Sequence, residues 1–127
     1  MAEERTEKVV EGFKELVKSK LGVVPDHIAF MCDYAPRTVA NFVRMYTATM
    51  AKGALDTKTK ELIGLALAAA LGCTHCMVWH TIMALEAGAT KEEIAEVLAV
   101  VTVMTGGPGL VTWSEHVVKV LKDKGLI

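Results

Sequence analysis

Apolar side chains recur with the 3.6-residue period of an α-helix along nearly the whole chain, and this pattern constrains the fold more than any other feature of the sequence. No segment alternates apolar and polar residues for long enough to indicate a β-sheet. The sequence therefore predicts an all-α protein of six or seven helices. In the first of them, the apolar positions are Val9, Val10, Phe13, Leu16 and Val17.

Glycine, proline and capping residues mark the expected ends of the helices. The last helix should follow a break at residues 106–109, where the sequence reads GGPG. Because the connections are short, consecutive helices should pack as antiparallel neighbours in a single domain covering residues 1–127. The expected helices cover residues 3–20, 28–32, 36–52, 57–71, 73–87, 91–104 and 111–124.

Two of these helices have recognisable capping residues at their start. Asp56 or Thr57 can cap the helix at 57–71. Thr90, followed three residues later by Glu93, forms the sequence pattern of a capping box. Beyond Glu96 the helix that follows Thr90 is apolar nearly all round, so we expect it to lie centrally or at an interface.

The charge balance gives no reason to expect a nucleic acid or an anionic membrane as a partner. The formal net charge is −1, and the Lys and Arg residues are scattered. The longest apolar run, residues 62–73, is too short to cross a bilayer, and the charged N-terminal segment lacks the apolar run of a signal peptide. We therefore expect a soluble protein of the cytoplasm that does not bind membranes.

Apolar residues make up 52% of the chain but aromatic residues only 6%, so the apolar surplus is mainly aliphatic. A small domain with surplus aliphatic surface often buries it between subunits. The composition favours a homo-oligomer, with a tightly packed, alanine-rich core as the alternative.

The octet CTHCMVWH, residues 73–80, contains the residues that point to chemistry. If it lies in one helix, Cys73, Cys76 and His80 fall within about 60° of arc on one face. Cys73 would lie at the start of the helix, where unpaired backbone N–H groups and the helix dipole favour a thiolate. His80 could accept a proton from Cys76 one turn away. His75 would point in another direction, so spacing alone assigns it no role.

A Cys-x-x-Cys pair at a helix start favours dithiol–disulfide exchange, because the two sulfurs can bond with little backbone movement. Two alternatives stay open: a zinc site and an inert pair of core cysteines. A structural zinc site would want four ligands, and Cys32 lies far away in an apolar segment. A c-type haem site is rejected because Met77, not histidine, follows Cys76.

Two further residues have more than one interpretation. Glu61 lies twelve residues before Cys73, and an antiparallel return of the chain could bring its carboxylate to His80. The alternative for Glu61 is a solvent-facing acid that favours the helix start. Cys32 is interpreted as a small buried apolar residue, with a resolving or oligomer contact as its alternative.

The pattern Glu61-x11-Cys73-x-His75-Cys76-x3-His80 resembles the alkylhydroperoxidase D (AhpD)-like family, which belongs to the carboxymuconolactone decarboxylase superfamily. The resemblance covers about residues 35–110 and matches the family pattern at every position. It implies an AhpD-like helical domain that assembles into trimers or hexamers. It also implies hydroperoxide reduction by the cysteine pair, with no bound cofactor or metal.

The resemblance further implies roles for the residues and for partners. Cys73 and Cys76 would be the redox pair, and Glu61, His75 and His80 would form a proton relay. Cys76 would attack the peroxide and Cys73 would resolve it, although the helix-start argument favours Cys73 as the attacking thiol. An external dithiol such as dihydrolipoamide would restore the pair, and a lipoyl protein and a peroxiredoxin are the implied partners.

Two other functions remain as alternatives. One is a decarboxylase-type enzyme that uses Glu61 and His80 for acid–base chemistry on a small organic acid. The other is a metal-binding or purely structural oligomer. The cysteine pair favours the redox enzyme over the decarboxylase, because the decarboxylase branch of the superfamily generally lacks such a pair.

Overall fold

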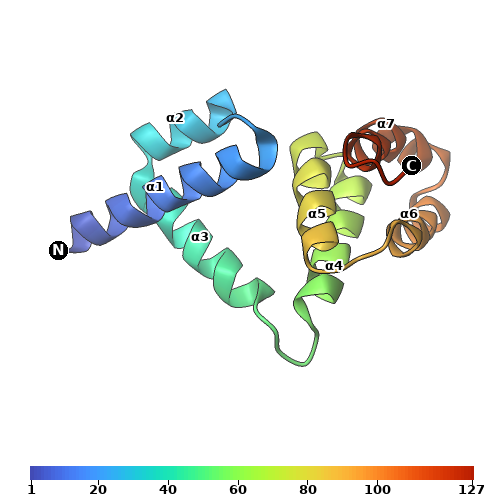
Figure 1. Ribbon diagram of the computed structural model, residues 1–127, viewed down its shortest axis with the longest axis horizontal. Coiled ribbons are helices and arrows are strands. Elements are labelled where there is room, and N and C mark those ends of the chain that lie inside the picture. The colour runs from blue at the N-terminus through green and yellow to red at the C-terminus, as the bar shows by residue number, and fades with distance from the viewer. The chain divides into compact units, whose positions relative to one another are not determined.

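The computed structural model describes the backbone of residues 1–127 and the surroundings of every residue except 109, 112 and 114. Seven α-helices and no β-strands form this described backbone (Figure 1), so the prediction of an all-α fold is confirmed. The helices form two compact units, residues 1–51 and residues 52–127. Within the described backbone, no helix is both long and apolar enough to cross a membrane.

The first unit consists of α1 (Ala2–Leu21), α2 (Asp26–Tyr34) and α3 (Pro36–Met50). The helix α2 is longer than the predicted segment 28–32, because the carbonyl of Pro25 accepts hydrogen bonds from the backbone N–H groups that follow it and so starts the helix earlier. The helix α3 begins at Pro36 as predicted, since proline fits the first helical turn. The buried core of this unit consists of Val10, Cys32, Val39 and Ala40.

The second unit consists of α4 (Thr57–Leu71), α5 (Thr74–Glu86), α6 (Lys91–Thr105) and α7 (Gly107–Asp123). The helix α4 packs against the other three, and α7 also packs against α5 and α6. These contacts enclose a larger apolar core than that of the first unit. Its buried members are Leu65, Ala68, Ala69, Met77, Ile94, Leu98, Val101, Val117 and Leu121.

The predicted caps of α4 and α6 are present. A side-chain oxygen of Asp56 accepts a hydrogen bond of 2.7 Å from the backbone N–H of Thr59. In the capping box, Thr90 Oγ1 accepts from the Glu93 N–H at 3.1 Å, and Glu93 Oε2 accepts from the Thr90 N–H at 2.9 Å. Local hydrogen bonding of this kind depends only on neighbouring residues, which is why the sequence predicts it well.

The sequence predicts a break over residues 106–109, and this prediction is wrong because the break is shorter. Gly106 alone makes the turn, with φ 76° and ψ −166°, and α7 begins at Gly107 rather than near residue 111. Proline in the first turn of a helix loses no helical hydrogen bond, because the N–H groups there have no partner within the helix. Pro108 therefore extends α7 towards Gly106 instead of interrupting it.

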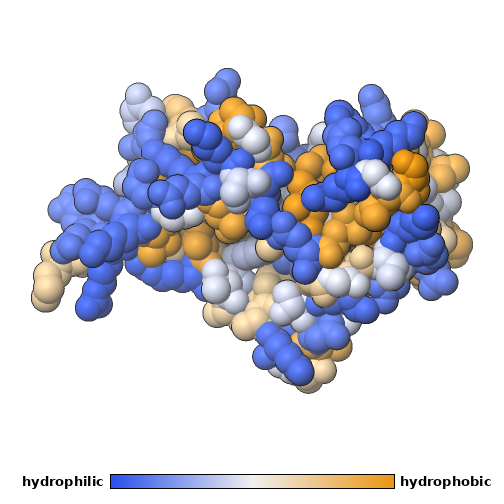
Figure 2. Space-filling view, viewed as in Figure 1, coloured by the Kyte–Doolittle hydropathy of each residue, from blue (hydrophilic) through white to orange (hydrophobic). Residues whose placement is uncertain are grey.

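Only one side of α6 is buried within the chain. Ile94, Leu98 and Val101 belong to the core, whereas Val103 and Met104 are about four-fifths exposed. The prediction that α6 is central thus holds for one face. Figure 2 shows apolar surface, drawn in orange, on both units. The homo-oligomer stays a prediction.

Candidate active site

A disulfide between Cys73 and Cys76 lies at the N-terminal end of α5. The two sulfur atoms are 2.03 Å apart and the two Cα atoms 5.2 Å apart. Cys73 is the residue that precedes the helix, and Gly72, with φ 70°, ends α4 directly before it. A left-handed backbone conformation costs glycine little, so the chain can leave α4 and enter α5 within three residues. The tight connection thereby places Cys73 directly before α5 and Cys76 in its first turn.

The position of the pair has a chemical consequence for its reduced form. The first backbone N–H groups of a helix have no partner within the helix and carry partial positive charge. A negative charge on a sulfur in this turn is stabilised by them, which favours the reactive thiolate. Cys73 and Cys76 are both partly exposed, so a reagent in solvent can reach this end of α5.

A buried carboxylate on α4 is hydrogen-bonded to an imidazole on α5. Glu61 Oε2 lies 2.8 Å from His80 Nδ1. The Glu61 side chain is 1% exposed and the His80 side chain 18% exposed. The solvent-facing alternative for Glu61 is therefore wrong, and the expected approach of Glu61 to His80 is confirmed.

This hydrogen bond defines what each nitrogen of His80 can do. When Glu61 is ionised it can only accept, so Nδ1 carries the hydrogen and donates it. The other ring nitrogen, Nε2, is then the one that can accept a proton. Because His80 follows Cys76 by four residues in α5, the imidazole and the second cysteine lie on the same side of that helix.

Gly64 makes the approach between α4 and His80 possible. A Cβ atom on Gly64 would lie 2.9 Å from Nδ1 and 3.0 Å from Cε1 of His80. Such distances are shorter than van der Waals contact, so any larger residue would push the ring away from Glu61. Sequence analysis missed Gly64; the available signal was an isolated glycine inside a helix, which often marks a close approach.

An ion pair holds the start of α4 against α6, one turn before Glu61. Lys58 Nζ lies 2.8 Å from Glu93 Oε1. The hydrogen bond from Lys58 lowers the pKa of Glu93, and the hydrogen bond from the Thr90 backbone lowers it further. The same contact with Glu93 raises the pKa of Lys58. The carboxylate of Glu93 thus caps α6 and binds α4 at the same time.

The remaining predicted residues lie in different surroundings. His75 is exposed in the first turn of α5, directly before Cys76. Cys32 lies in the core of residues 1–51, as expected for a small apolar residue, and burial raises the pKa of its thiol. Among the described side chains, no three or more of His, Cys, Asp and Glu are grouped so that they could hold a metal ion.

The fold and the site define an all-helical protein in which a Cys-x-x-Cys disulfide lies on the same helix as the histidine of a Glu–His pair. The chain belongs to the carboxymuconolactone decarboxylase family, whose sequence model matches residues 36–119. This match runs from the start of α3 into α7 and includes Glu61, both cysteines of the pair, and His80.

Two relatives of known sequence cover different shares of the chain. Uncharacterized protein H16_B0147 of Cupriavidus necator is 37% identical over 93 residues, which are 73% of this chain and 82% of that protein. Uncharacterized protein 4 in cox locus, from Paracoccus denitrificans, is 38% identical over 66 residues, or 52% of this chain and 60% of that protein. Neither name specifies an activity.

Two crystal structures share the fold. A candidate carboxymuconolactone decarboxylase from Burkholderia xenovorans has a TM-score of 0.76 at 23% identity, with 94% of this chain and 93% of that chain covered. The apo form of lpg0406, a carboxymuconolactone decarboxylase family protein from Legionella pneumophila, has a TM-score of 0.69 at 30% identity, with 90% and 95% covered. These similarities confirm the predicted helical fold of the family.

Proposed function

We propose that the protein is a thiol-dependent hydroperoxide reductase of the AhpD-like type, which cycles Cys73 and Cys76 between dithiol and disulfide. The observation that carries the proposal is a disulfide on the same helix as His80, whose imidazole is hydrogen-bonded to the buried Glu61. A pair that serves only to hold the fold together would need no such proton acceptor beside it. A chain of this length can also bury enough apolar surface to fold without a disulfide.

The first step oxidises one cysteine. In the reduced protein, Nε2 of His80 accepts the thiol proton of Cys76, and Glu61 stabilises the resulting imidazolium. The Cys76 thiolate attacks one oxygen of the hydroperoxide, the O–O bond breaks, and the sulfur becomes a sulfenic acid. The leaving alkoxide takes the proton from His80 and departs as an alcohol.

The second step forms the disulfide, and a third restores the dithiol. The Cys73 sulfur attacks the sulfenic sulfur of Cys76, the S–O bond breaks, and water leaves. Cys73 is the resolving thiol in this scheme because His80 lies one helical turn from Cys76 and so assigns the attack to Cys76. An external dithiol then exchanges with the disulfide, becomes a disulfide itself and returns both cysteines to thiols.

The reductant and the assembly are also part of the proposal. Dihydrolipoamide is the dithiol we expect, delivered by a lipoyl protein, and a peroxiredoxin would be a further redox partner in the cytoplasm. His75, exposed beside Cys76, would pass protons between solvent and the relay. The exposed aliphatic side chains of α4 and α6, including Leu67 and Val103, favour assembly into a trimer or hexamer.

A peroxide-consumption assay with a panel of dithiols tests the activity. We expect turnover of cumene hydroperoxide with dihydrolipoamide and no turnover in the Cys73→Ser or Cys76→Ser variants. If Cys76 attacks first, a sulfenic acid should accumulate on Cys76 in the Cys73→Ser variant and be trapped by dimedone. Failure of every dithiol to support turnover would contradict the proposal.

A second candidate rests on the Glu61–His80 pair alone. A general acid–base pair of this kind could serve decarboxylation of a small organic acid, the chemistry that gives the family its name. Such chemistry would not need the cysteines. A Cys73→Ser/Cys76→Ser double variant that still turns over a lactone acid would therefore favour this second candidate.

A further inference from the structure

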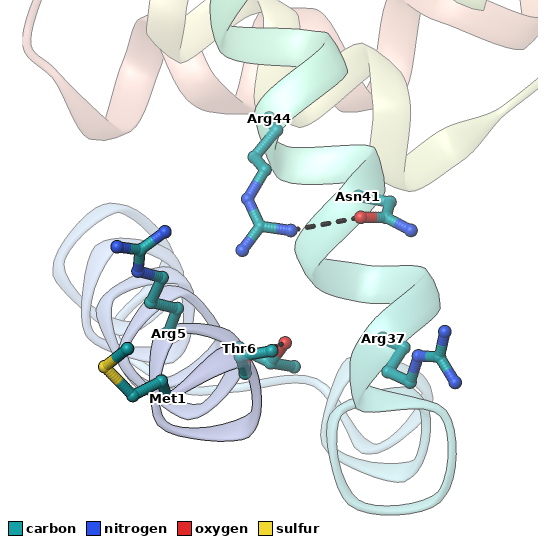
Figure 3. A pocket seen from close by; sticks show the side chains of 7 residues that line it. Met1, Arg5, Thr6, Arg37, Asn41 and Arg44 are labelled. Atoms are coloured by element: carbon teal, nitrogen blue, oxygen red, sulfur yellow. Dashed lines mark hydrogen bonds between the residues drawn. The ribbon is translucent and has the colours of Figure 1, made fainter.

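An open surface cavity of about 470 Å³ lies between α1 and α3 in the first unit, away from the cysteine pair in sequence, and all of its lining residues except Thr6 are exposed. Figure 3 shows that both helices contribute polar side chains to it. The volume is within the range of about 300–1,000 Å³ that small-molecule sites occupy. The lining residues are Met1, Ala2, Arg5, Thr6, Arg37, Asn41 and Arg44.

The three arginines of this cavity have no acidic partner. Among the described side chains, no carboxylate forms an ion pair with Arg5, Arg37 or Arg44, and none lines the cavity. Arg44 donates only to the neutral Oδ1 of Asn41, at 3.0 Å. The acid next to Arg5 in sequence, Glu4, is instead bonded to Lys8 at 3.1 Å.

Several basic side chains elsewhere on the two units are paired with acids. Lys14 lies 3.0 Å from Asp33, Lys58 lies 2.8 Å from Glu93, and Lys119 lies 2.6 Å from Asp123. Three guanidinium groups around one cavity repel one another unless an anion lies between them. Their planar forks match the oxygens of phosphate groups, which they bind in a bidentate manner.

The spacing of the lining residues indicates the length of the anion. Arg37, Asn41 and Arg44 follow one another at intervals of four and three residues, so they share one face of α3. They cover about 10 Å along the helix axis, which leaves room along α3 for more than one phosphate. In Figure 3 the side chain of Arg44 extends from α3 towards α1, Arg5 projects from α1, and the guanidinium of Arg37 is turned outward at the edge.

We propose that this cavity binds a small molecule that carries two or more linked phosphate groups. Arg5 from α1 and Arg44 from α3 hold the phosphates from the two sides, and Asn41 orients Arg44. Arg37 lies at the edge with its guanidinium turned away from α1, so it contributes only longer-range attraction. The site is independent of the redox cycle proposed for the cysteines.

Titration calorimetry of the full chain at low salt tests the proposal, with tripolyphosphate, pyrophosphate and inorganic phosphate as probes. We expect one tripolyphosphate per chain, bound more tightly than pyrophosphate and at least about tenfold more tightly than phosphate. ATP as a fourth probe distinguishes a nucleotide from an inorganic polyphosphate. ATP should bind more tightly than tripolyphosphate if the protein also contacts the nucleoside. ATP should bind equally tightly or less tightly if the protein contacts only the phosphates.

Variants that each remove one positive charge distinguish a specific phosphate-binding site from non-specific attraction of anions to the positive charge of the protein. Arg5→Gln and Arg44→Gln should each weaken tripolyphosphate binding about tenfold, and Arg37→Gln by less. The control is Lys18→Gln, which removes the same charge from an exposed position of α1 and should leave binding unchanged. Helical circular dichroism and melting temperature verify that each variant is folded.

Three results would overturn the proposal. One is the absence of saturable binding of tripolyphosphate, pyrophosphate or ATP at millimolar concentration. A second is equal weakening by Lys18→Gln and Arg44→Gln, which would indicate attraction to overall charge. The third is binding to phosphatidylserine vesicles or to duplex DNA without binding to tripolyphosphate. The arginines would then bind a membrane or a nucleic acid and not a small molecule.

Discussion

The imidazole of His80 on α5 is held by the buried carboxylate of Glu61 on α4, with 2.8 Å between Nδ1 and Oε2. This pair links two helices that approach each other closely at Gly64. A carboxylate hydrogen-bonded to Nδ1 fixes the orientation of the ring. The imidazole is therefore held at a defined place one helical turn from Cys76, where the proposed mechanism needs a proton acceptor.

Removal of the charge on Glu61 should slow the oxidation of the cysteine pair. In Glu61→Gln the amide oxygen can still accept from Nδ1, but an imidazolium on His80 loses its counter-charge. General acid–base contributions are about 10²- to 10⁴-fold, so we expect disulfide formation to slow by about 10²-fold. The measurement is rapid mixing of the reduced protein with one equivalent of cumene hydroperoxide. Glu96→Gln, an exposed change of the same kind on α6, is the control, and equal rates in both variants would contradict the relay.

Addition of a single methyl group at Gly64 should reduce activity without unfolding the protein. The Cβ of Gly64→Ala would come within 2.9 Å of His80 Nδ1 and displace the ring from Glu61. We expect a loss of peroxide turnover of about tenfold or more, since misplaced catalytic groups cost rate steeply. The imidazole resonances of His80 in NMR spectra should shift as well.

The matched control for Gly64→Ala is Gly12→Ala in α1. A Cβ on Gly12 would meet nothing within 4 Å, so this substitution should stabilise the helix by about 0.5–1 kcal/mol and leave turnover unchanged. If Gly64→Ala behaves in the same way as Gly12→Ala, Gly64 has no positioning role.

Truncation of a core leucine should destabilise the protein far more than truncation of an exposed one in the same helix. Leu65 is 0% exposed, and Leu65→Ala should lower the free energy of unfolding by about 2–5 kcal/mol. Leu67, two residues later, is 59% exposed, so Leu67→Ala should change stability by about 0.5 kcal/mol or less. Urea denaturation measures both values. A large loss in Leu67→Ala with a concentration-dependent midpoint would instead reveal a subunit interface on α4.

The Lys58–Glu93 contact should make stability depend on acid pH. The folded protein holds the pKa of Glu93 below its ordinary value of 4.5, chiefly through the hydrogen bond from Lys58. The ionised carboxylate therefore stabilises the fold above that ordinary value, and this contribution is lost as the pH falls through the lower pKa of the folded state.

The variant Glu93→Gln isolates this contribution, because an amide oxygen can still accept from the Thr90 N–H of the capping box. We expect Glu93→Gln to be less stable than the wild type at pH 7, and the difference to shrink as the pH falls below 4.5. Thermal melts between pH 7 and pH 3 measure the difference. A difference that is constant over this range would show that the charge of Glu93 is not what stabilises the contact.

Much of the fold follows from local features of the sequence. The caps at Asp56 and Thr90 and the end of α4 at Gly72 were predictable, because each depends on residues only a few positions apart. The start of α7 was not, because GGPG resembles a break, whereas Gly106 alone makes the turn and the helix begins at Gly107. A proline that follows a glycine can thus stand in the first turn of a helix and need not mark the end of one.

The candidate site was only partly predictable, because some of its contacts depend on how two helices pack. Spacing within the octet places Cys73, Cys76 and His80 on one face of α5 without further information. The contact of Glu61 with His80 requires the register between α4 and α5, which short-range rules do not specify. Gly64 has meaning only once that register is known, and the cavity between Arg5 and Arg44 joins residues far apart in the chain.

The central claim is that the two sulfurs of residues 73 and 76 are the site of oxidation by a hydroperoxide. The most direct measurement is the number of thiols per chain, counted under denaturing conditions after the fully reduced protein has reacted with one equivalent of cumene hydroperoxide. The count includes Cys32, so the reduced protein has three thiols. We predict a fall from three thiols to one, with the Cys73–Cys76 disulfide identified in the peptide map. A count that stays at three while the peroxide remains unconsumed would contradict the account.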